Sequence, residues 1–139
     1  SKVVVGSGPA REPLMAKYPE TPFFIADGDQ DLVRYYNAAD VFVFPSVTDT
    51  FGLVMLEALA CGVPVAAFPV TGPKDVIGTS TVGVLDTDLA QAAVNAQGID
   101  PVLCREHALK FSWDTVVSEF VDYLAPFTPP QEPSAQAAQ

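Results

Sequence analysis

Short apolar runs alternate along the chain with longer segments in which apolar residues recur every three or four positions. The most informative run, residues 41–44, shows no alternation of apolar and polar side chains, which is typical of a strand buried on both faces. From Gly52 apolar residues recur at helical spacing until Gly62, a residue type that often ends helices. A second apolar run, residues 63–68, follows directly. This stretch therefore predicts a strand, a loop, a helix and a strand, which together form a parallel crossover unit.

The same alternation continues on both sides of this unit. Short apolar runs predict further strands at residues 2–5, 23–26 and 82–85. Helical spacing predicts helices at residues 10–18, 30–38, 74–77 and 101–110, and one more that is capped by residues 86–88 and runs through Ala96. We therefore expect a doubly wound, Rossmann-like α/β domain of five or so parallel strands with helices on both faces.

The last predicted helix begins after Ser112, a cap-type residue. One face of this helix is apolar along its whole length, which predicts contact with the core. The apolar face consists of Trp113, Val116, Val117, Phe120, Val121 and Leu124. From Pro126 the composition changes to Pro, Gln, Ala and Ser, which predicts a folded domain at 1–125 and a disordered tail at 126–139.

Composition and charge narrow the classes of function. With 139 residues, 49% hydrophobic and 17% charged, the chain suits one folded domain. A net charge of −10 argues against nucleic acid and anionic membranes as partners of this piece. Two cysteines, Cys61 and Cys104, are too few for a disulfide framework or a zinc site and are expected to be buried thiols. No run is long enough to span a bilayer and no signal peptide precedes the first strand, so we expect a cytoplasmic protein.

The loop after residues 41–44 carries the clearest chemistry. It lies at the carboxyl end of a buried parallel strand, which is the edge where open α/β sheets bind ligands. Asp49 lies in this loop beside the free backbone N–H groups of Phe51, Gly52 and Leu53, and a helix start of this kind suits a phosphate. Together with Glu57 on the helix, Asp49 offers carboxylates that accept hydrogen bonds from hydroxyl groups. A diphosphate flanked by two polyols is a nucleotide sugar.

Segment 49–62, DTFGLVMLEALACG, resembles the donor-site signature of retaining GT-B glycosyltransferases of the large family four. The resemblance continues through residues 69–73 and 75–77, covers nearly all of residues 2–125, and is closest to bacterial mannosyltransferase-like members that modify glycolipids. That family shows two glutamates with seven residues between them. Here the spacing is kept, but the first position is Asp49, one methylene shorter.

The resemblance implies a role for each residue of the signature. Asp49 is the position that holds hydroxyls of the transferred sugar, and Glu57 holds the ribose hydroxyls. The backbone approaches the sugar and the diphosphate at Thr50, Phe51, Gly52 and Leu53. No metal and no cofactor is expected, since the nucleotide sugar is a substrate. The alternative, purely structural interpretation is that Asp49 is a helix cap and Glu57 a solvent-facing residue.

Two further loops have both a structural and a functional interpretation. Gly6 and Gly8 follow the first strand, but Arg11 stands where a dinucleotide fingerprint has its third glycine, so a plain tight turn is one interpretation. By resemblance, both glycines contact the donor. Asp27 follows the second strand and either caps the next helix or, by resemblance, contacts the nucleotide base.

Enzymes of the resembled family have two such domains that meet in a cleft. The chain is therefore expected to be most of the second domain, to lack that domain's first strand and helix, and to need an N-terminal domain for turnover. The expected function is to bind the donor of a retaining glycosyltransferase that moves a sugar from GDP-mannose or a UDP-sugar to a lipid or glycan acceptor. Membrane contact, at the inner face, is expected only through the other domain.

Two other functions remain open at this point. A nucleotide-sugar epimerase of the same architecture would bind the same kind of ligand. A non-catalytic interaction module could retain the fold without turnover, and the shorter carboxylate at Asp49 is compatible with both.

Overall fold

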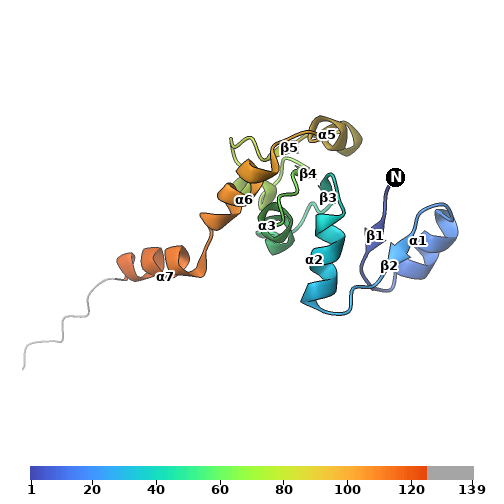
Figure 1. Ribbon diagram of the computed structural model, residues 1–139, viewed down its shortest axis with the longest axis horizontal. Coiled ribbons are helices and arrows are strands. Elements are labelled where there is room, and N and C mark those ends of the chain that lie inside the picture. Colours follow the sequence, from blue (N-terminus) through green and yellow to red (C-terminus); the bar gives the residue numbers. More distant parts are fainter. Residues whose placement is uncertain (125–139) are drawn as a thin grey trace, which may run out of the picture.

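A computed structural model describes residues 1–124 and shows helices alternating with short strands (Figure 1). The elements in chain order are β1 Val4–Val5, α1 Arg11–Lys17, β2 Phe23–Phe24, α2 Asp29–Asn37, β3 Phe42–Phe44, α3 Leu53–Ala60, β4 Val65–Ala67, α4 Pro73–Val76, β5 Gly83–Leu85, α5 Leu89–Asn95, α6 Pro101–Leu109 and α7 Trp113–Asp122. Each predicted element has a counterpart. The tail predicted at 126–139 lies outside the described residues.

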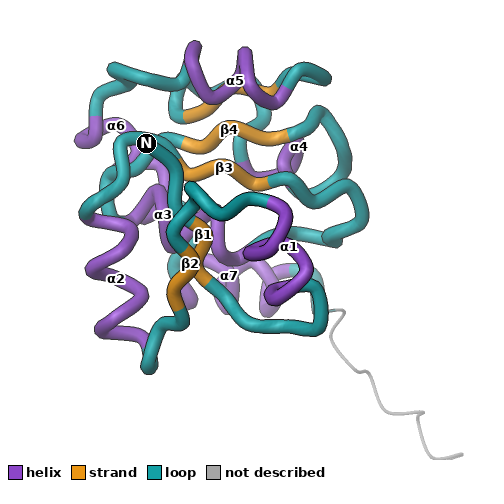
Figure 2. The backbone as a smooth tube through the Cα atoms, turned by 90° about the vertical axis from the view of Figure 1, so that its right-hand side faces the viewer, coloured by secondary structure: helices purple, strands orange, loops and turns teal. Residues whose placement is uncertain are grey.

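The strands are parallel, as predicted, but they form two sheets. β1 pairs with β2, and β3, β4 and β5 form a second sheet in that order. Figure 2 shows β1 and β2 running across the direction of β3 and β4. The α/β class with parallel sheets flanked by helices is therefore confirmed. The five strands do not join into one sheet because, among residues 1–124, no strand pairs with both β1 and β3.

The core lies on both faces of the three-stranded sheet. In β4 the side chains of Val65 and Ala67 pack on one face with Met55 and Leu59 of α3, and all four are fully buried. Ala66 points to the other face, where it packs against α5. This alternation follows from the period of two in a strand. β4 is therefore the strand that is buried on both faces.

The strand predicted to be buried on both faces, β3, is an edge strand. Phe44 is buried, whereas Val43 is 42% exposed. β3 pairs with β4 along one edge, and within residues 1–124 no strand pairs with its other edge. The apolar run correctly predicted a strand, but its burial depends on neighbours that the run itself does not encode.

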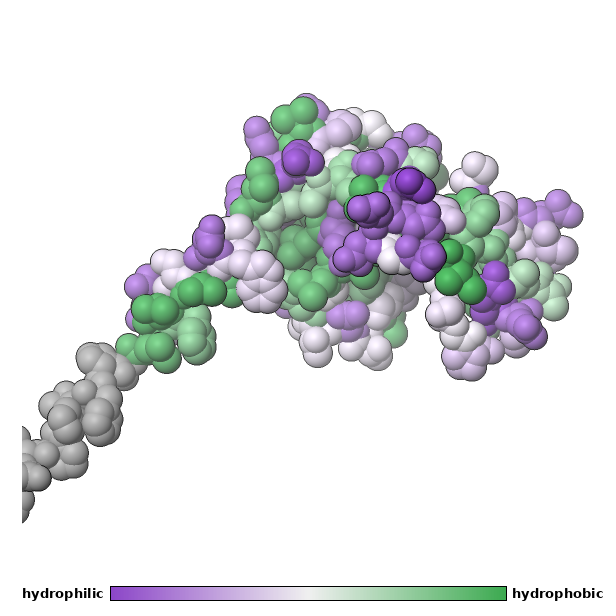
Figure 3. Space-filling model, turned by 60° about the horizontal axis from the view of Figure 1, so that its bottom comes forward, coloured by the Kyte–Doolittle hydropathy of each residue, from purple (hydrophilic) through white to green (hydrophobic). Residues whose placement is uncertain are grey.

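Helix α7 departs from the predicted core contact. It begins where expected, since Ser112 Oγ accepts a hydrogen bond from the backbone N–H of Thr115 at 3.2 Å. However, none of its residues is buried, and Trp113 and Phe120 are 81% and 64% exposed. Figure 1 shows α7 extending away from the other elements, and Figure 3 shows apolar side chains along it. Within residues 1–124 no element covers this apolar face.

Both cysteines are free thiols. Cys104 is fully buried, as predicted, whereas Cys61 is only half-buried because it lies at the end of α3. Burial raises the pKa of both thiols, which makes them poor nucleophiles. Of the helices in the described part of the chain, none has the length and apolar character needed to cross a membrane.

Helix α5 offers a direct test of capping. Asp88 Oδ1 accepts hydrogen bonds from the backbone N–H groups of Ala90 and Gln91 at 3.0 and 3.1 Å. We expect Asp88→Ala to lower the free energy of unfolding by about 1 kcal/mol, because both N–H groups lose their partner. Asp88→Asn is the matched control, since an amide oxygen caps nearly as well. Equal urea midpoints for the wild type and the alanine variant would contradict this account of the cap.

Candidate functional site

The loop between β3 and α3 follows the carboxyl end of β3, as predicted. Asp49 Oδ1 accepts a hydrogen bond from the N–H of Phe51 at 3.1 Å, which closes a local turn before the helix. Helix α3 itself begins at Leu53, with Gly52 at the N-cap and no side-chain cap. The alternative interpretation of Asp49 as the cap of this helix is therefore wrong. The first N–H groups of α3 are left without a side-chain partner, which suits an anion.

Gly52 is required by the backbone and by the core. Its φ of +83° lies in the left-handed region that other residues rarely adopt. A Cβ here would lie 2.6 Å from Met55 Cε and 3.3 Å from Phe44 Cζ. The positive φ already requires a glycine here, and the predicted close approach of a ligand to its backbone stays a prediction.

The loop is also supported by the neighbouring loop, which follows β4. Gly72, in the turn before α4, approaches so closely that a Cβ would lie 3.0 Å from the Asp49 carbonyl oxygen and 3.2 Å from that of Phe51. The Phe51 ring packs edge-on against Phe111, with 6.1 Å between ring centroids. These contacts fix the backbone of the loop, while the side chains of Asp49 and Thr50 remain exposed.

Glu57 lies on the exposed side of α3, the helix that follows the loop. Its Oε2 accepts a hydrogen bond from the hydroxyl of Tyr36 at 3.0 Å. Glu57 is therefore exposed but not simply solvent-facing. The sequence places Tyr36 only on the apolar side of its helix, so no local signal identified it as a partner of the signature.

The three other predicted donor contacts lie in the loops that follow β1 and β2. The N–H of Gly6 donates to the carbonyl of Phe24, and a Cβ at Gly6 or Gly8 would meet no atom within 4 Å. Asp27 does not cap α2, because the N-cap is Gly28 and the backbone N–H of Asp27 donates to Asp31 Oδ2. No hydrogen bond of the described residues joins these positions to the loop before α3. Their role as donor contacts stays a prediction.

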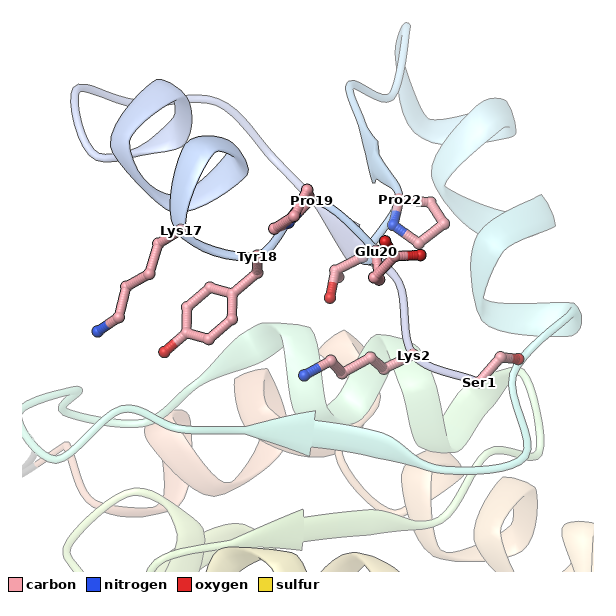
Figure 4. Close-up of a pocket in the computed structure, with 8 residues that line it drawn as sticks. Ser1, Lys2, Lys17, Tyr18, Pro19, Glu20 and Pro22 are labelled. Carbon is pink, nitrogen blue, oxygen red and sulfur yellow. The ribbon is translucent and has the colours of Figure 1, made fainter.

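A cavity of about 580 Å³ lies at the opposite end of β1 and β2 from the predicted contacts. It is lined by Ser1, Lys2, Lys17, Tyr18, Pro19, Glu20, Thr21 and Pro22. Figure 4 shows the side chains of Lys17 and Lys2 on either side of Tyr18. The distance from the lysine Nζ to the centroid of the Tyr18 ring is 5.4 Å for Lys2 and 5.3 Å for Lys17. None of the predicted donor residues lines this cavity.

Comparison with known proteins assigns the family. The family model described as glycosyl transferases group 1 matches residues 2–97, which include all the predicted site residues. A curated D-inositol 3-phosphate glycosyltransferase from Saccharomonospora viridis is 40% identical over 114 residues, covering 73% of this chain and 26% of the relative. One from Mycobacteroides abscessus is 35% identical, covering 77% and 27%. The chain thus spans about a quarter of the length of these relatives.

Solved structures agree on the fold. Sucrose-phosphate synthase from Thermosynechococcus elongatus superposes with a TM-score of 0.65 at 28% identity, over 86% of this chain and 36% of that one. The pneumococcal O-GlcNAc transferase GtfA, solved with UDP and GlcNAc, superposes with a TM-score of 0.65 at 19% identity, over 86% and 28%, and supports the fold alone. Because the family model covers well over half of its residues, this chain belongs to the glycosyl transferases group 1 family.

Proposed function

We propose that this chain binds the donor in a retaining glycosyltransferase and presents a nucleoside diphosphate sugar at the loop before α3. The observation that carries the proposal is that no side chain caps the N-terminus of α3, which lies between the exposed carboxylates of Asp49 and Glu57. Uncapped N–H groups suit the diphosphate, and carboxylates on either side suit the hydroxyls of sugar and ribose. Membership of a glycosyl transferase family favours transfer over an epimerase or a non-catalytic interaction module.

The chemical burden of such a transfer is negative charge that develops on the leaving diphosphate. Backbone N–H groups held in place before the reaction stabilise that charge without reorganising. In this proposal Asp49 binds hydroxyls of the transferred sugar and so fixes the anomeric carbon relative to the acceptor. Phe51 and Gly72 contribute indirectly, because they fix the loop backbone. That no metal or cofactor takes part stays a prediction.

GDP-mannose and UDP-sugars remain the donors that we propose. The relatives are named for D-inositol 3-phosphate, so a phosphorylated polyol joins lipids and glycans as an acceptor class to be tested. With a net charge of −10 on this chain, attraction of an anionic donor has to come from local N–H groups rather than from the overall field. A cytoplasmic location, with membrane contact only through other parts of the enzyme, stays a prediction.

The free edges of β1 and β3 are consistent with a larger domain. If a strand preceding β1 in the full-length protein lay between β1 and β3, the order would become β2-β1-X-β3-β4-β5, the doubly wound arrangement. The exposed apolar face of α7 is likewise suited to packing against another part of the enzyme. We therefore propose that an N-terminal domain and one further strand complete the donor site.

Titration of the chain with GDP, UDP and ADP tests the proposed function. We expect amide shifts in NMR spectra that are grouped at residues 48–57, with one nucleotide preferred. Residues 6–8 and 26–29 should shift as well if the two-stranded sheet contributes to the site. Shifts confined to the cavity around Tyr18 would contradict the proposed site. If no residue shifts at millimolar nucleotide, the same titration on the full-length protein decides, and an absence of binding there would refute donor binding.

A further inference from the structure

A buried hydroxyl group meets an exposed carboxylate on the surface of α3. Tyr36, on α2, is only 6% exposed, and its hydroxyl lies 3.0 Å from Glu57 Oε2 and 3.4 Å from the carbonyl oxygen of Val54. A phenol has one hydrogen to donate. The shorter, charge-assisted contact with Glu57 takes that hydrogen in preference to the longer one.

The position of this hydroxyl is fixed by the packing of its ring. Tyr36 is buried in a cluster with Ala58 and Val63, and it packs edge-on against Phe42 with 5.5 Å between ring centroids. Because two torsions place a tyrosine ring and both are restricted here, the hydroxyl is a rigid point on the surface of α3. Ala58 is the immediate neighbour of Glu57, so the tyrosine and the carboxylate are joined both through packing and through the hydrogen bond.

The hydroxyl also keeps its proton. Burial, followed by the hydrogen bond to Glu57 and the negative charge of that residue, raises the pKa of Tyr36 well above its usual range. Throughout the physiological pH range the group is therefore a neutral donor. It can hold the ionised carboxylate without competing with it for a ligand's hydroxyl protons.

Glu57 needs such a partner if it is to bind a ligand selectively. An exposed glutamate has three side-chain torsions and loses much of this freedom when it is ordered. With Oε2 held by Tyr36, Oε1 has no hydrogen-bond partner within residues 1–124 and remains available as an acceptor. A carboxylate ordered before the ligand arrives binds more tightly and more selectively than a mobile one.

We propose that Tyr36 is a positioning residue that holds Glu57 in the conformation that accepts the two hydroxyls of a nucleotide's ribose. This inference rests on the proposed function, because it assigns a ligand to the same site. Tyr36 touches no ligand itself. By ordering the Glu57 carboxylate so that it can accept hydrogen bonds from a vicinal diol, Tyr36 determines the selectivity for ribose.

Two variants separate this role from a structural one. Tyr36→Phe removes the hydroxyl and leaves the ring in the cluster. Tyr35→Phe is the matched control, because Tyr35 is the adjacent residue of α2, is half-buried and packs against Phe24 at 5.4 Å, and its hydroxyl makes no hydrogen bond with the described residues. Both variants lose one oxygen atom, so any difference between them reports the contact with Glu57.

The test measures the affinity of each protein for the best-bound of GDP, UDP and ADP and for its 2′,3′-dideoxy form. We expect Tyr36→Phe to weaken binding of the ribonucleotide by about tenfold, the usual size of one hydrogen bond to a charged group. Binding of the dideoxy form should not change, since it has no diol to present. Tyr35→Phe should affect neither. Equal weakening of both nucleotides, or no weakening of either, would overturn the proposal.

A second measurement needs no nucleotide and separates the inference from the proposed function. The side-chain couplings of Glu57 and its carboxyl ¹³C shift should indicate one ordered conformation in the wild type and averaging in Tyr36→Phe only. If the wild type is ordered but binds no nucleotide even as the full-length protein, the proposed function fails while the positioning contact stands. If Glu57 is already averaged in the wild type, the positioning role itself is refuted.

Discussion

Asp49→Asn in the full-length enzyme is expected to lower kcat/KM for sugar transfer by about 100- to 1,000-fold, the usual effect of removing one transition-state contact. Affinity for the free nucleoside diphosphate should hardly change. In the proposed site Asp49 binds the transferred sugar, and the diphosphate is bound by backbone N–H groups further along the loop. The measurement is the initial rate with the donor whose nucleotide the titration selects, together with the Kd of that nucleotide.

Asparagine is the informative substitution at this position because the turn survives. The Asp49 carboxylate accepts the N–H of Phe51 at 3.1 Å, and an asparagine oxygen can accept the same bond. The variant therefore loses charge and a second acceptor oxygen but keeps the local backbone. Asp49→Ala loses the turn as well, and the difference in melting temperature between the two variants measures what the turn contributes.

A charge control is available a short distance before the loop. Asp40 is an exposed aspartate that precedes β3, so Asp40→Asn changes the net charge equally without touching the loop. We expect it to retain wild-type turnover. If Asp49→Asn also retained wild-type turnover, the proposed role of Asp49 in holding the sugar would be wrong.

Local signals in the sequence predicted the crossover unit well. The apolar runs became β3 and β4, and α3 ends at Ala60, with Gly62 at a φ of +79° just beyond it. These features depend on a few neighbouring residues and on backbone rules that hold in any protein. What the runs could not predict was which strand lies in the middle. β4 has a neighbour on each edge and β3 has one, and pairing is decided by distant segments.

In the candidate site, too, the sequence predicted the residues of a local pattern but not their partners from distant segments. Asp49 and Glu57 could be selected from the sequence because their spacing and the glycine between them form one local pattern. The residues that hold them could not, since Tyr36 reaches Glu57 from another helix and Gly72 reaches the loop from beyond β4. The apolar face of α7 shows another limit of prediction from local sequence. Its periodicity correctly predicted a helix, but a periodic pattern does not identify the partner that would cover it.

Gly72→Ala is expected to have the second large effect, because this glycine is constrained twice. Its φ of +85° with a ψ of −74° lies in a region that alanine rarely adopts, which costs about 1–3 kcal/mol. In addition, the new Cβ would lie 3.0 Å from the carbonyl oxygen of Asp49 and 3.2 Å from that of Phe51. These are backbone atoms, so relief requires the loop before α3 to move, and we expect a further cost of about 1–3 kcal/mol.

Comparison of Gly72→Ala with Gly98→Ala isolates the second of these effects, the steric clash. Gly98 has nearly the same φ, +83°, but a Cβ there would meet no atom within 4 Å, so this variant carries only the backbone cost. Urea unfolding should therefore show a larger loss for Gly72→Ala than for Gly98→Ala. In the nucleotide titration Gly72→Ala should also lose affinity, because the displaced loop carries the N–H groups proposed to bind the diphosphate, whereas Gly98→Ala should bind as the wild type does. Equal losses of stability and unchanged affinity in both variants would mean that the turn before α4 does not hold the loop in place.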